Sequence, residues 1–346
     1  MKNNPLGLEG IEFVEFSSPR PKELEFLFQE LGFSFRYEHK KKNVRRYQQG
    51  EIQFLVNNSP GSFAESFYKA HGPCVPAMGW RVKDAKKALE IAVSQGAKAA
   101  SSVDYQREGR EIPALVGVGD SLIYLIDDYS QEFLYERMGF TKAETPIIVP
   151  EKGFLRVDHL TNNVFKGEME ALSQFYKTVF GFTEIRYFDI RGIKTGLTSY
   201  ALRSPCGTFA IPINEGTEKK SQINEYLDDY KGPGVQHIAL LTDNLLGSLS
   251  LLESSSIQTL DIDDDYYAQV FNRVPNVKED HKEIQRRNVL VDGDDEGYLL
   301  QIFTKNVIGP IFFEMIQREK HEAFGEGNFG ALFRAIEKDQ ERRGFL

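Results

Sequence analysis

The chain has 346 residues, of which 41% are hydrophobic and 27% charged, which is typical of a soluble globular protein of about two domains. Its net charge of −9 argues against a nucleic-acid or anionic-membrane partner, since both require a basic face. Two cysteines are too few for a disulfide framework. Because the sequence also shows no membrane-length apolar run and no signal-peptide core at residues 1–10, we expect a cytoplasmic protein.

The hydrophobic pattern predicts single helices separated by groups of strands, which favours an α+β fold over a parallel α/β fold. In chain order we expect a strand at 11–16, a helix at 22–31, strands at 52–56 and 78–82, a helix at 84–94, and a strand at 121–126. The second half then offers a strand at 154–160, a helix at 172–179, a strand at 236–241, a helix at 244–255 and a strand at 297–303. Between the halves, the proline-containing stretch TKAETPIIVPEKG (141–153) predicts a linker and hence domains 1–148 and 149–346.

The sequence repeats itself internally. GPCVPAMGWRVKDAKKAL (72–89) aligns without a gap on GPGVQHIALLTDNLLGSL (232–249), and 10–33 parallels 156–182 in its order of strand, helix and Gly-Phe. A unit of one strand, one helix and several strands therefore occurs about four times, twice in each half. Such recurrence implies duplicated units that share a core.

Two histidines and one glutamate stand out as metal ligands. His159 and His237 lie in strand-like segments, and Glu314 lies in the apolar run 311–316, where burying a lone carboxylate is costly unless it is paired or metal-bound. His237 follows His159 by 78 residues and Glu314 follows His237 by 77, so equivalent strands would bring all three together. This donor set is the facial triad of non-haem Fe(II) oxygenases, with zinc as the alternative metal. The first half has Phe13 and Ala77 at the matching positions, so its role should be structural.

Six segments resemble, in order and spacing, the motifs of 4-hydroxyphenylpyruvate dioxygenases: VDHLTNNV, FAIPINEGTEKKSQI, GPGVQHIAL, YLLQIFTK, IFFEMIQR and GEGNFGALFRAIE. The resemblance is dense over 154–338 and fainter in the first half. It implies a vicinal oxygen chelate fold, in which four βαβββ modules pair into two open-barrel domains. It further implies one Fe(II) per chain, held by His159, His237 and Glu314. The implied reaction converts 4-hydroxyphenylpyruvate and O₂ to homogentisate and CO₂, in a homodimer or homotetramer.

The resemblance also points to the residues that would bind a phenolic keto acid. It implies catalytic amides at Gln222, Gln236 and Gln301, and substrate contacts at Ser199, Pro212, Asn214, Phe303, Phe312, Phe324, Asn328 and Phe329. The aromatic members suit the wall of a phenyl pocket. Gln236 adjoins His237, and an ideal strand would face the two apart, so this assignment requires a β-bulge or a twist at the end of the strand.

The C-terminal segment predicts a lid. Asn328 can cap a helix whose apolar face repeats at i, i+3, i+4 and i+7 (Phe329, Leu332, Phe333 and Ile336). Gly325 and Gly327 just before it can act as a hinge, and closure would exclude water from the site. An ordinary packed terminal helix is the alternative, and the two interpretations are compatible.

Three other functions remain open at this point. Hydroxymandelate synthase would use the same substrate and ligands, although the stretch 212–214 (Pro-Ile-Asn) resembles the dioxygenase more. An extradiol catechol dioxygenase would share the fold type and the triad but release no CO₂. A non-catalytic binding module of the same fold would consume no oxygen.

Overall fold

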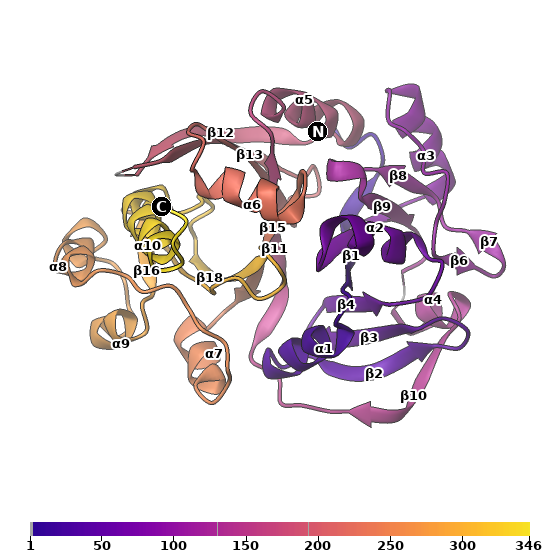
Figure 1. Ribbon diagram of the computed structural model, residues 1–346, viewed down its shortest axis with the longest axis horizontal. Helices are drawn as coiled ribbons and strands as arrows, with labels where there is room; N and C mark the ends of the chain where they lie inside the picture. The colour runs from indigo at the N-terminus through magenta and orange to yellow at the C-terminus, as the bar shows by residue number, and fades with distance from the viewer. Residues whose placement is uncertain (1–2, 130, 193) are drawn as a thin grey trace.

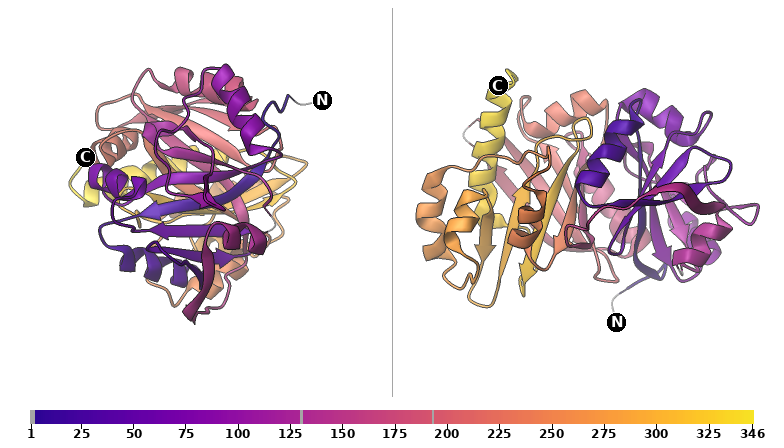
Figure 2. Two further views of the ribbon diagram at one scale, coloured as in Figure 1. Left: turned by 90° about the vertical axis from the view of Figure 1, so that its right-hand side faces the viewer. Right: turned by 90° about the horizontal axis from the view of Figure 1, so that it is seen from below.

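In the computed structural model, which describes residues 3–129, 131–192 and 194–346, two eight-stranded mixed sheets lie side by side (Figure 1). The strand orders are β10-β2-β3-β4-β1-β5-β9-β8 and β12-β13-β14-β11-β15-β18-β17-β16. Figure 2 shows that both sheets are curved, with a concave side (the hollow of the sheet) and helices packed around them. Within these described ranges, no helix is long and apolar enough to cross a membrane.

The first half contains, in order, β1 (Leu8–Ser17), α1 (Pro21–Glu30), β2 (Ser34–His39), β3 (Val44–Gln49), β4 (Ile52–Asn57), α2 (Phe63–His71), β5 (Cys74–Val82), α3 (Ala85–Ser94), a small hairpin of β6 (Gln106–Arg107) and β7 (Arg110–Glu111), β8 (Ala114–Val116), η1 (Val118–Asp120), β9 (Leu122–Ile126), α4 (Gln131–Arg137) and β10 (Phe140–Ile147).

The second half contains β11 (Phe154–Val164), α5 (Met169–Phe175), the π-helical turn η2 (Tyr176–Phe180), β12 (Thr183–Arg191), β13 (Gly196–Arg203), β14 (Ala210–Gly216), α6 (Gln222–Tyr230), β15 (Gly234–Thr242), α7 (Leu245–Leu252), α8 (Asp264–Arg273), α9 (His281–Arg286), β16 (Leu290–Gly293), β17 (Tyr298–Phe303), β18 (Phe312–Glu319), η3 (Glu326–Asn328) and α10 (Phe329–Arg342). The strands and helices predicted from the sequence are all present, and their local signals explain where they begin. The side chains of Asp84 and Asn244 each accept a backbone N–H bond at 2.9 Å and so cap α3 and α7.

The two sheets repeat one pairing pattern. In the first, β1 pairs parallel with β4 and antiparallel with β5, and β5 pairs parallel with β9. In the second, β11 pairs parallel with β14 and antiparallel with β15, and β15 pairs parallel with β18. This repetition is the duplication expected from the sequence, and it confirms the four-module vicinal oxygen chelate architecture.

The register identifies which residues of the first sheet take the ligand positions. The two sheets can be aligned on their central strand pairs, β1 with β5 in the first sheet and β11 with β15 in the second. In this alignment Phe13 of β1 corresponds to His159 of β11, and Tyr124 of β9 corresponds to Glu314 of β18. The rings of Phe13, Tyr105 and Tyr124 pack together there, with centroids 5.3 to 6.0 Å apart. The first sheet therefore fills with aromatic side chains the space that the second sheet keeps open.

The predicted linker at 141–153 is wrong in its first part. Residues 140–147 form β10, which pairs antiparallel with β2 at the edge of the first sheet. Pro146 is tolerated there because an edge strand does not need every backbone N–H for pairing. We propose that the domain boundary lies at 148/149, because β10 still belongs to the first sheet and β11, from Phe154, begins the second.

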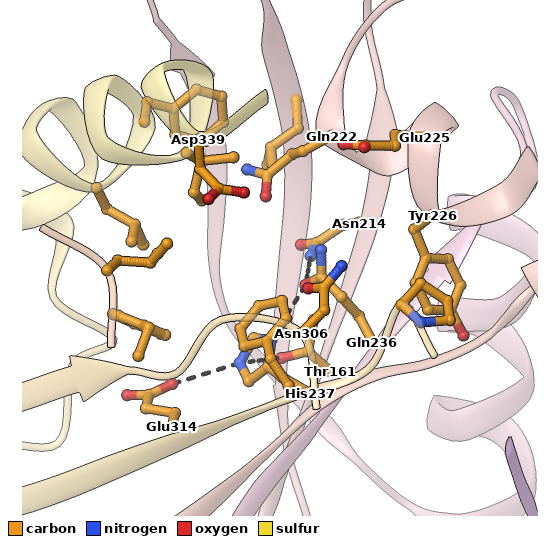
Figure 3. A pocket seen from close by; sticks show the side chains of 18 of the residues that line it. Thr161, Asn214, Gln222, Glu225, Tyr226, Gln236, His237, Asn306, Glu314 and Asp339 are labelled. Atoms are coloured by element: carbon orange, nitrogen blue, oxygen red, sulfur yellow. Dashed lines mark hydrogen bonds and ion pairs between the residues drawn. The ribbon is translucent and has the colours of Figure 1, made fainter. Parts of the chain in front are cut away.

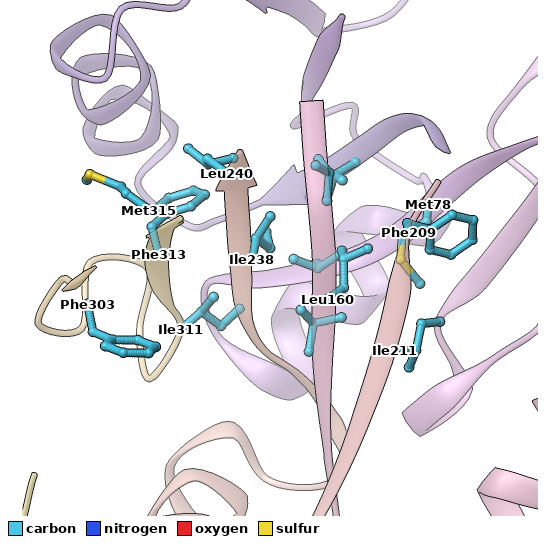
Figure 4. Close-up of a cluster of buried hydrophobic side chains, with 14 of the residues drawn as sticks. Met78, Leu160, Phe209, Ile211, Ile238, Leu240, Phe303, Ile311, Phe313 and Met315 are labelled. Carbon is cyan, nitrogen blue, oxygen red and sulfur yellow. The ribbon is translucent and has the colours of Figure 1, made fainter. Parts of the chain in front are cut away.

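One face of the second sheet is apolar and packs toward the first half. Figure 4 shows Leu160, Ile238 and Phe313 on neighbouring strands within this buried cluster. The ring of Phe313 lies 6.0 Å from that of Phe54 in the first sheet, which joins the two halves. Because side chains alternate along a strand, the neighbours of these apolar residues face the other side, where the hollow lies.

Candidate metal centre and pocket

The three candidate ligands come from three adjacent strands. His159 is on β11, His237 on β15 and Glu314 on β18, and β15 pairs with both of the others. The residue after each ligand, such as Leu160 or Ile238, is fully buried on the opposite, apolar face. The strand alternation that was expected from the sequence therefore points all three ligands into the hollow.

The ligand atoms lie at the separations that one metal ion requires. Nε2 of His159 is 3.0 Å from Oε2 of Glu314, and Nε2 of His237 is 3.3 Å from that oxygen and 3.3 Å from Nε2 of His159. An ion bound at about 2.1 Å to each would separate its ligand atoms by about 3.0 Å at octahedral angles and about 3.4 Å at tetrahedral angles. The donor set therefore fits one divalent cation. In the part of the chain that the structure describes, His159, His237 and Glu314 are the group of His, Cys, Asp or Glu residues whose ligand atoms lie close enough together to hold one metal ion.

The electrostatics of the group also favour a cation. Burial by itself would lower the pKa of His159, but the carboxylates of Glu314 and Asp158 outweigh it and raise that pKa to about 9. Burial would raise the pKa of Glu314, whereas the two histidines lower it to about 2. The carboxylate of Glu314 is therefore ionised and strongly attracts positive charge.

Each histidine is oriented by the residue before it. Nδ1 of His159 donates to Oδ2 of Asp158 at 2.8 Å, and Nδ1 of His237 donates to Oε1 of Gln236 at 3.0 Å. Both arrangements depend on β-bulges, because the register of β11 against β15 shifts at these positions. Of the two irregularities that the sequence allowed at Gln236, the structure has the β-bulge. With Nδ1 held in this bond, Nε2 is the nitrogen of each ring that would bind a metal, which at His159 would displace a proton.

A cavity of about 560 Å³ adjoins the three ligands, a size typical of small-molecule sites. Its lining includes, besides these ligands, most of the sequence-predicted site residues: Ser199, Pro212, Asn214, Gln222, Gln236, Gln301, Phe303, Phe312, Phe324 and Phe329. They reach it from β13, β14, β15, β17, β18, α6 and the C-terminal segment, which are far apart in the sequence.

Aromatic rings surround the ligands. Phe312 stacks on His237 with centroids 4.9 Å apart, and Phe324 meets His159 edge-on at 5.4 Å. Phe303 lies edge-on to His237 at 6.2 Å. This arrangement gives the cavity an apolar wall beside the polar ligands, as a phenyl ring next to a chelating group would require.

Amide groups lie on the other walls. Figure 3 shows Asn214, Gln222 and Gln236 around one region of the pocket, across from Glu314. Asn214 donates to Oε1 of Gln236 at 3.5 Å and pairs in register with Ser199 across β13 and β14. Such groups can donate or accept, and therefore suit a ligand with carboxylate, keto and hydroxyl oxygens.

Asn328 differs from its predicted role. Its side chain does not cap α10. Instead Oδ1 accepts from the hydroxyl of Tyr266 at 2.6 Å, and Nδ2 donates to Gln301 at 2.8 Å. Gln301 in turn donates to Oε1 of Glu314 at 3.0 Å. Asn328 is buried and is not among the residues that line the cavity, where it was expected to contact substrate; it holds Gln301, which does line it. Both of its partners are distant in the sequence, so a local pattern could not indicate them.

Some residues of the pocket were missed by the sequence reasoning. Oγ1 of Thr161 lies 3.1 Å from Nε2 of His237, and its position two residues after His159 on a strand would have indicated the same face. Glu225 of α6 and Arg343, just after α10, form an ion pair beside the cavity mouth. No signal in the sequence connects those two residues.

Comparisons with known proteins agree with this geometry. Residues 2–141 match the family model described as "Hydroxyphenylpyruvate dioxygenase, HPPD, N-terminal", and residues 156–300 match "Glyoxalase/Bleomycin resistance protein/Dioxygenase superfamily". A 4-hydroxyphenylpyruvate dioxygenase of Legionella pneumophila (strain Corby) is 44% identical over 99% of this chain and 98% of its own. The chain belongs to the 4-hydroxyphenylpyruvate dioxygenase family.

Two further proteins are similar to nearly the whole chain. Protein MelA of Shewanella colwelliana is 53% identical over 100% of this chain and 99% of its own. Among solved structures, a mutant of 4-hydroxymandelate synthase from Streptomyces coelicolor superposes with a TM-score of 0.83 at 22% identity, covering 96% of this chain and 99% of that one. This last likeness shows the shared fold alone.

Proposed function

We propose that this protein is an Fe(II)-dependent dioxygenase that converts 4-hydroxyphenylpyruvate and O₂ to homogentisate and CO₂, in the breakdown of tyrosine and phenylalanine. The observation that carries the proposal is the convergence of His159, His237 and Glu314, with ligand atoms 3.0 to 3.3 Å apart, on the wall of an aromatic-lined cavity. The family membership of the whole chain supports the choice of substrate.

We assign one Fe(II) per chain to these three residues. Their imidazole and carboxylate donors suit iron, and a triad on one face leaves positions for other ligands. Bound there, iron supplies the redox chemistry with O₂ that amino-acid side chains lack. Asp158 and Gln236 hold the two imidazoles with Nε2 toward the metal position.

The remaining pocket residues bind and orient the substrate. Phe303, Phe312 and Phe324 flank the ligands and provide the wall for the substrate ring. The side-chain amides of Gln222 and Gln236 reach the cavity from two different elements, and each can pair with carboxylate or phenolic oxygens. Holding both ends of the substrate restricts it to one orientation beside the metal.

The C-terminal helix excludes water from this reaction. α10 packs against β12 and α6 and lies over the hollow of the second sheet (Figure 1). Oε1 of Glu337 accepts from the backbone N–H and hydroxyl of Thr195 at 2.9 and 3.0 Å, and Gln340 donates to Glu225 at 2.8 Å. These bonds hold α10 closed from two sides. A site closed in this way protects reactive species from water.

We further propose that the protein is cytoplasmic and assembles as a homodimer or homotetramer. The motif resemblance supports this assembly, and the first domain, which has Phe13, Ala77 and Tyr124 at the positions of the three candidate ligands, is free to serve as an interface. Sedimentation of the purified protein measures the assembly directly.

Product analysis tests the reaction. Purified protein is given 4-hydroxyphenylpyruvate, Fe(II) and ascorbate in an oxygen electrode, and we expect homogentisate and CO₂ in equal amounts with the O₂ consumed. Glu314→Gln, which keeps the size of the side chain but removes its charge, is the matched control and should consume almost no O₂. Hydroxymandelate as the product would replace the proposal with the synthase reaction, and no O₂ uptake by the wild type would indicate a binding module.

A further inference from the structure

Arg318 binds the carboxylate that orients His159, the first candidate ligand in the chain. Its guanidinium forms a two-pronged ion pair with Asp158, with Nε 2.9 Å from Oδ1 and Nη2 2.9 Å from Oδ2. Both side chains are only 10% exposed. Oδ2 of Asp158 is also the atom that accepts the bond from Nδ1 of His159. One carboxylate therefore connects Arg318 to the metal ligand, in a geometry that a guanidinium fork favours.

The same guanidinium holds the segment that leads into the C-terminal helix. Nη1 of Arg318 donates to the backbone carbonyls of His321 and Ala323 at 3.0 and 2.6 Å. Its charged centre lies 5.6 Å from the ring of Phe324. Phe324 lines the cavity and packs edge-on against His159. Arg318 thus contacts two of the residues that pack on His159: Asp158, through its carboxylate, and Phe324, through its ring.

We propose that Asp158 and Arg318 are positioning residues for the metal centre, with Asp158 fixing the orientation of the His159 ring and Arg318 fixing both Asp158 and Phe324. This inference rests on the proposed function of the site. Outer partners that hold a metal-bound histidine commonly change metal affinity 10- to 100-fold when they are removed. Because Arg318 also anchors the wall formed by Phe324, its replacement should affect substrate binding as well.

The first sheet offers a matched control. Glu12 sits on the equivalent bulge of β1, immediately before Phe13, which corresponds to His159. It forms a buried ion pair with Arg81, with Nε 2.6 Å from Oε2. Glu12 therefore has the same place as Asp158 and also pairs with a guanidinium, although Arg81 comes from β5 and forms one short contact where Arg318 of β18 forms two. Phe13, and no metal-ligating residue, follows Glu12. Replacing Glu12 measures the structural cost of losing such a pair.

Asp158→Asn is the decisive variant. An amide has only one oxygen, whereas His159 and both prongs of Arg318 all donate hydrogen bonds to Asp158. Whichever way the amide turns, its NH₂ group faces at least one of these donors, so the variant loses part of this hydrogen bonding together with the negative charge. Arg318→Lys keeps the positive charge but loses the fork. Together the two variants separate charge from geometry.

The experiment measures the dissociation constant for Co(II), a spectroscopic substitute for Fe(II), on the full-length protein without substrate. Thermal unfolding is recorded for each variant, and KM is measured with Fe(II). We expect about 10- to 100-fold weaker Co(II) binding for Asp158→Asn and unchanged binding for Glu12→Gln. Arg318→Lys should weaken Co(II) binding and also raise KM.

The outcomes distinguish this inference from the proposed function. If the wild type binds no Co(II) and shows no turnover, the proposed function fails, and this inference fails with it. If the wild type binds Co(II) and Asp158→Asn binds it equally well while losing stability like Glu12→Gln, the pair is structural only. Should Asp158→Asn not fold, Arg318→Lys decides: unchanged Co(II) binding and KM would overturn the inference.

Discussion

Glu15 of the first sheet should make folding depend on pH. Its side chain is fully buried, accepts a hydrogen bond from the Tyr105 hydroxyl and lies in the field of Asp104. Burial and then the charge of Asp104 raise the pKa of Glu15 from 4.5 to about 8. A carboxyl whose folded pKa is raised contributes full stability below the unfolded pKa, and that contribution is lost as the pH rises toward the folded pKa.

The size of the effect follows from the shift. Between 4.5 and 8, each pH unit costs about 1.4 kcal/mol, which gives a limit on the order of 5 kcal/mol. Between pH 5 and pH 8 the cost to the wild type grows by about 3 to 4 kcal/mol, because the titration is incomplete at both ends. Glu15→Gln carries no such cost, since an amide does not titrate. Between pH 5 and pH 8, the free energy of unfolding of Glu15→Gln should therefore rise by this amount relative to that of the wild type.

Urea denaturation at pH 5, 6, 7 and 8 measures the difference between the two proteins. Comparing wild type with variant cancels the other titrating groups, including Asp158, whose pKa is lowered because Arg318 and His159 outweigh its burial. Glu90→Gln, at an exposed position of α3, is the control, and its free energy of unfolding should depend on pH as that of the wild type does. If Glu15→Gln also showed the pH dependence of the wild type, the reasoning would be refuted, since Glu15 would then not be held in its neutral form.

Three other predictions concern the site and the contact between the halves. Glu314→Ala should weaken metal binding and lower turnover by more than about 100-fold, which exceeds the loss typical of a residue that only holds a ligand in place. Its circular dichroism should stay native, and near-normal turnover would show that Glu314 is not part of the site. Truncation after Gly325 should abolish turnover, because it removes α10 and the Asn328 that holds Gln301, and full activity would reduce the helix to packing. Trp80→Ala should lower the free energy of unfolding by about 3 to 5 kcal/mol, since this buried ring packs on three phenylalanines of the second half; an unchanged denaturation midpoint would contradict that packing.

Much of the metal centre was predictable from the sequence. His159, His237 and Glu314 recur at one repeat length in apolar strand segments, and strand alternation follows from backbone geometry alone. Three equivalent strands of a duplicated unit must therefore point their ligands the same way. Helix starts were equally local, because a capping side chain such as Asp84 or Asn244 bonds within its own first turn.

Other features depend on which distant strands pair and in what register. The bulges at Asp158 and Gln236 arise from the pairing of β11 with β15, and neither strand encodes them alone. Residues 140–147 became a strand because β2 offered an edge, although their own composition indicated a linker.

The sequence by itself indicated the candidate ligands, the repeat and the order of the elements, because these depend on local periodicity and on residue chemistry. Only the tertiary structure decided the surroundings of the ligands. Asn328 had a capping role available in its own helix, but the buried hydroxyl of Tyr266 and the amide of Gln301 took its side chain instead. Likewise, Arg318 reaches Asp158 across 160 residues of chain. Such contacts are made between groups that only folding brings together, so no local pattern could have indicated them.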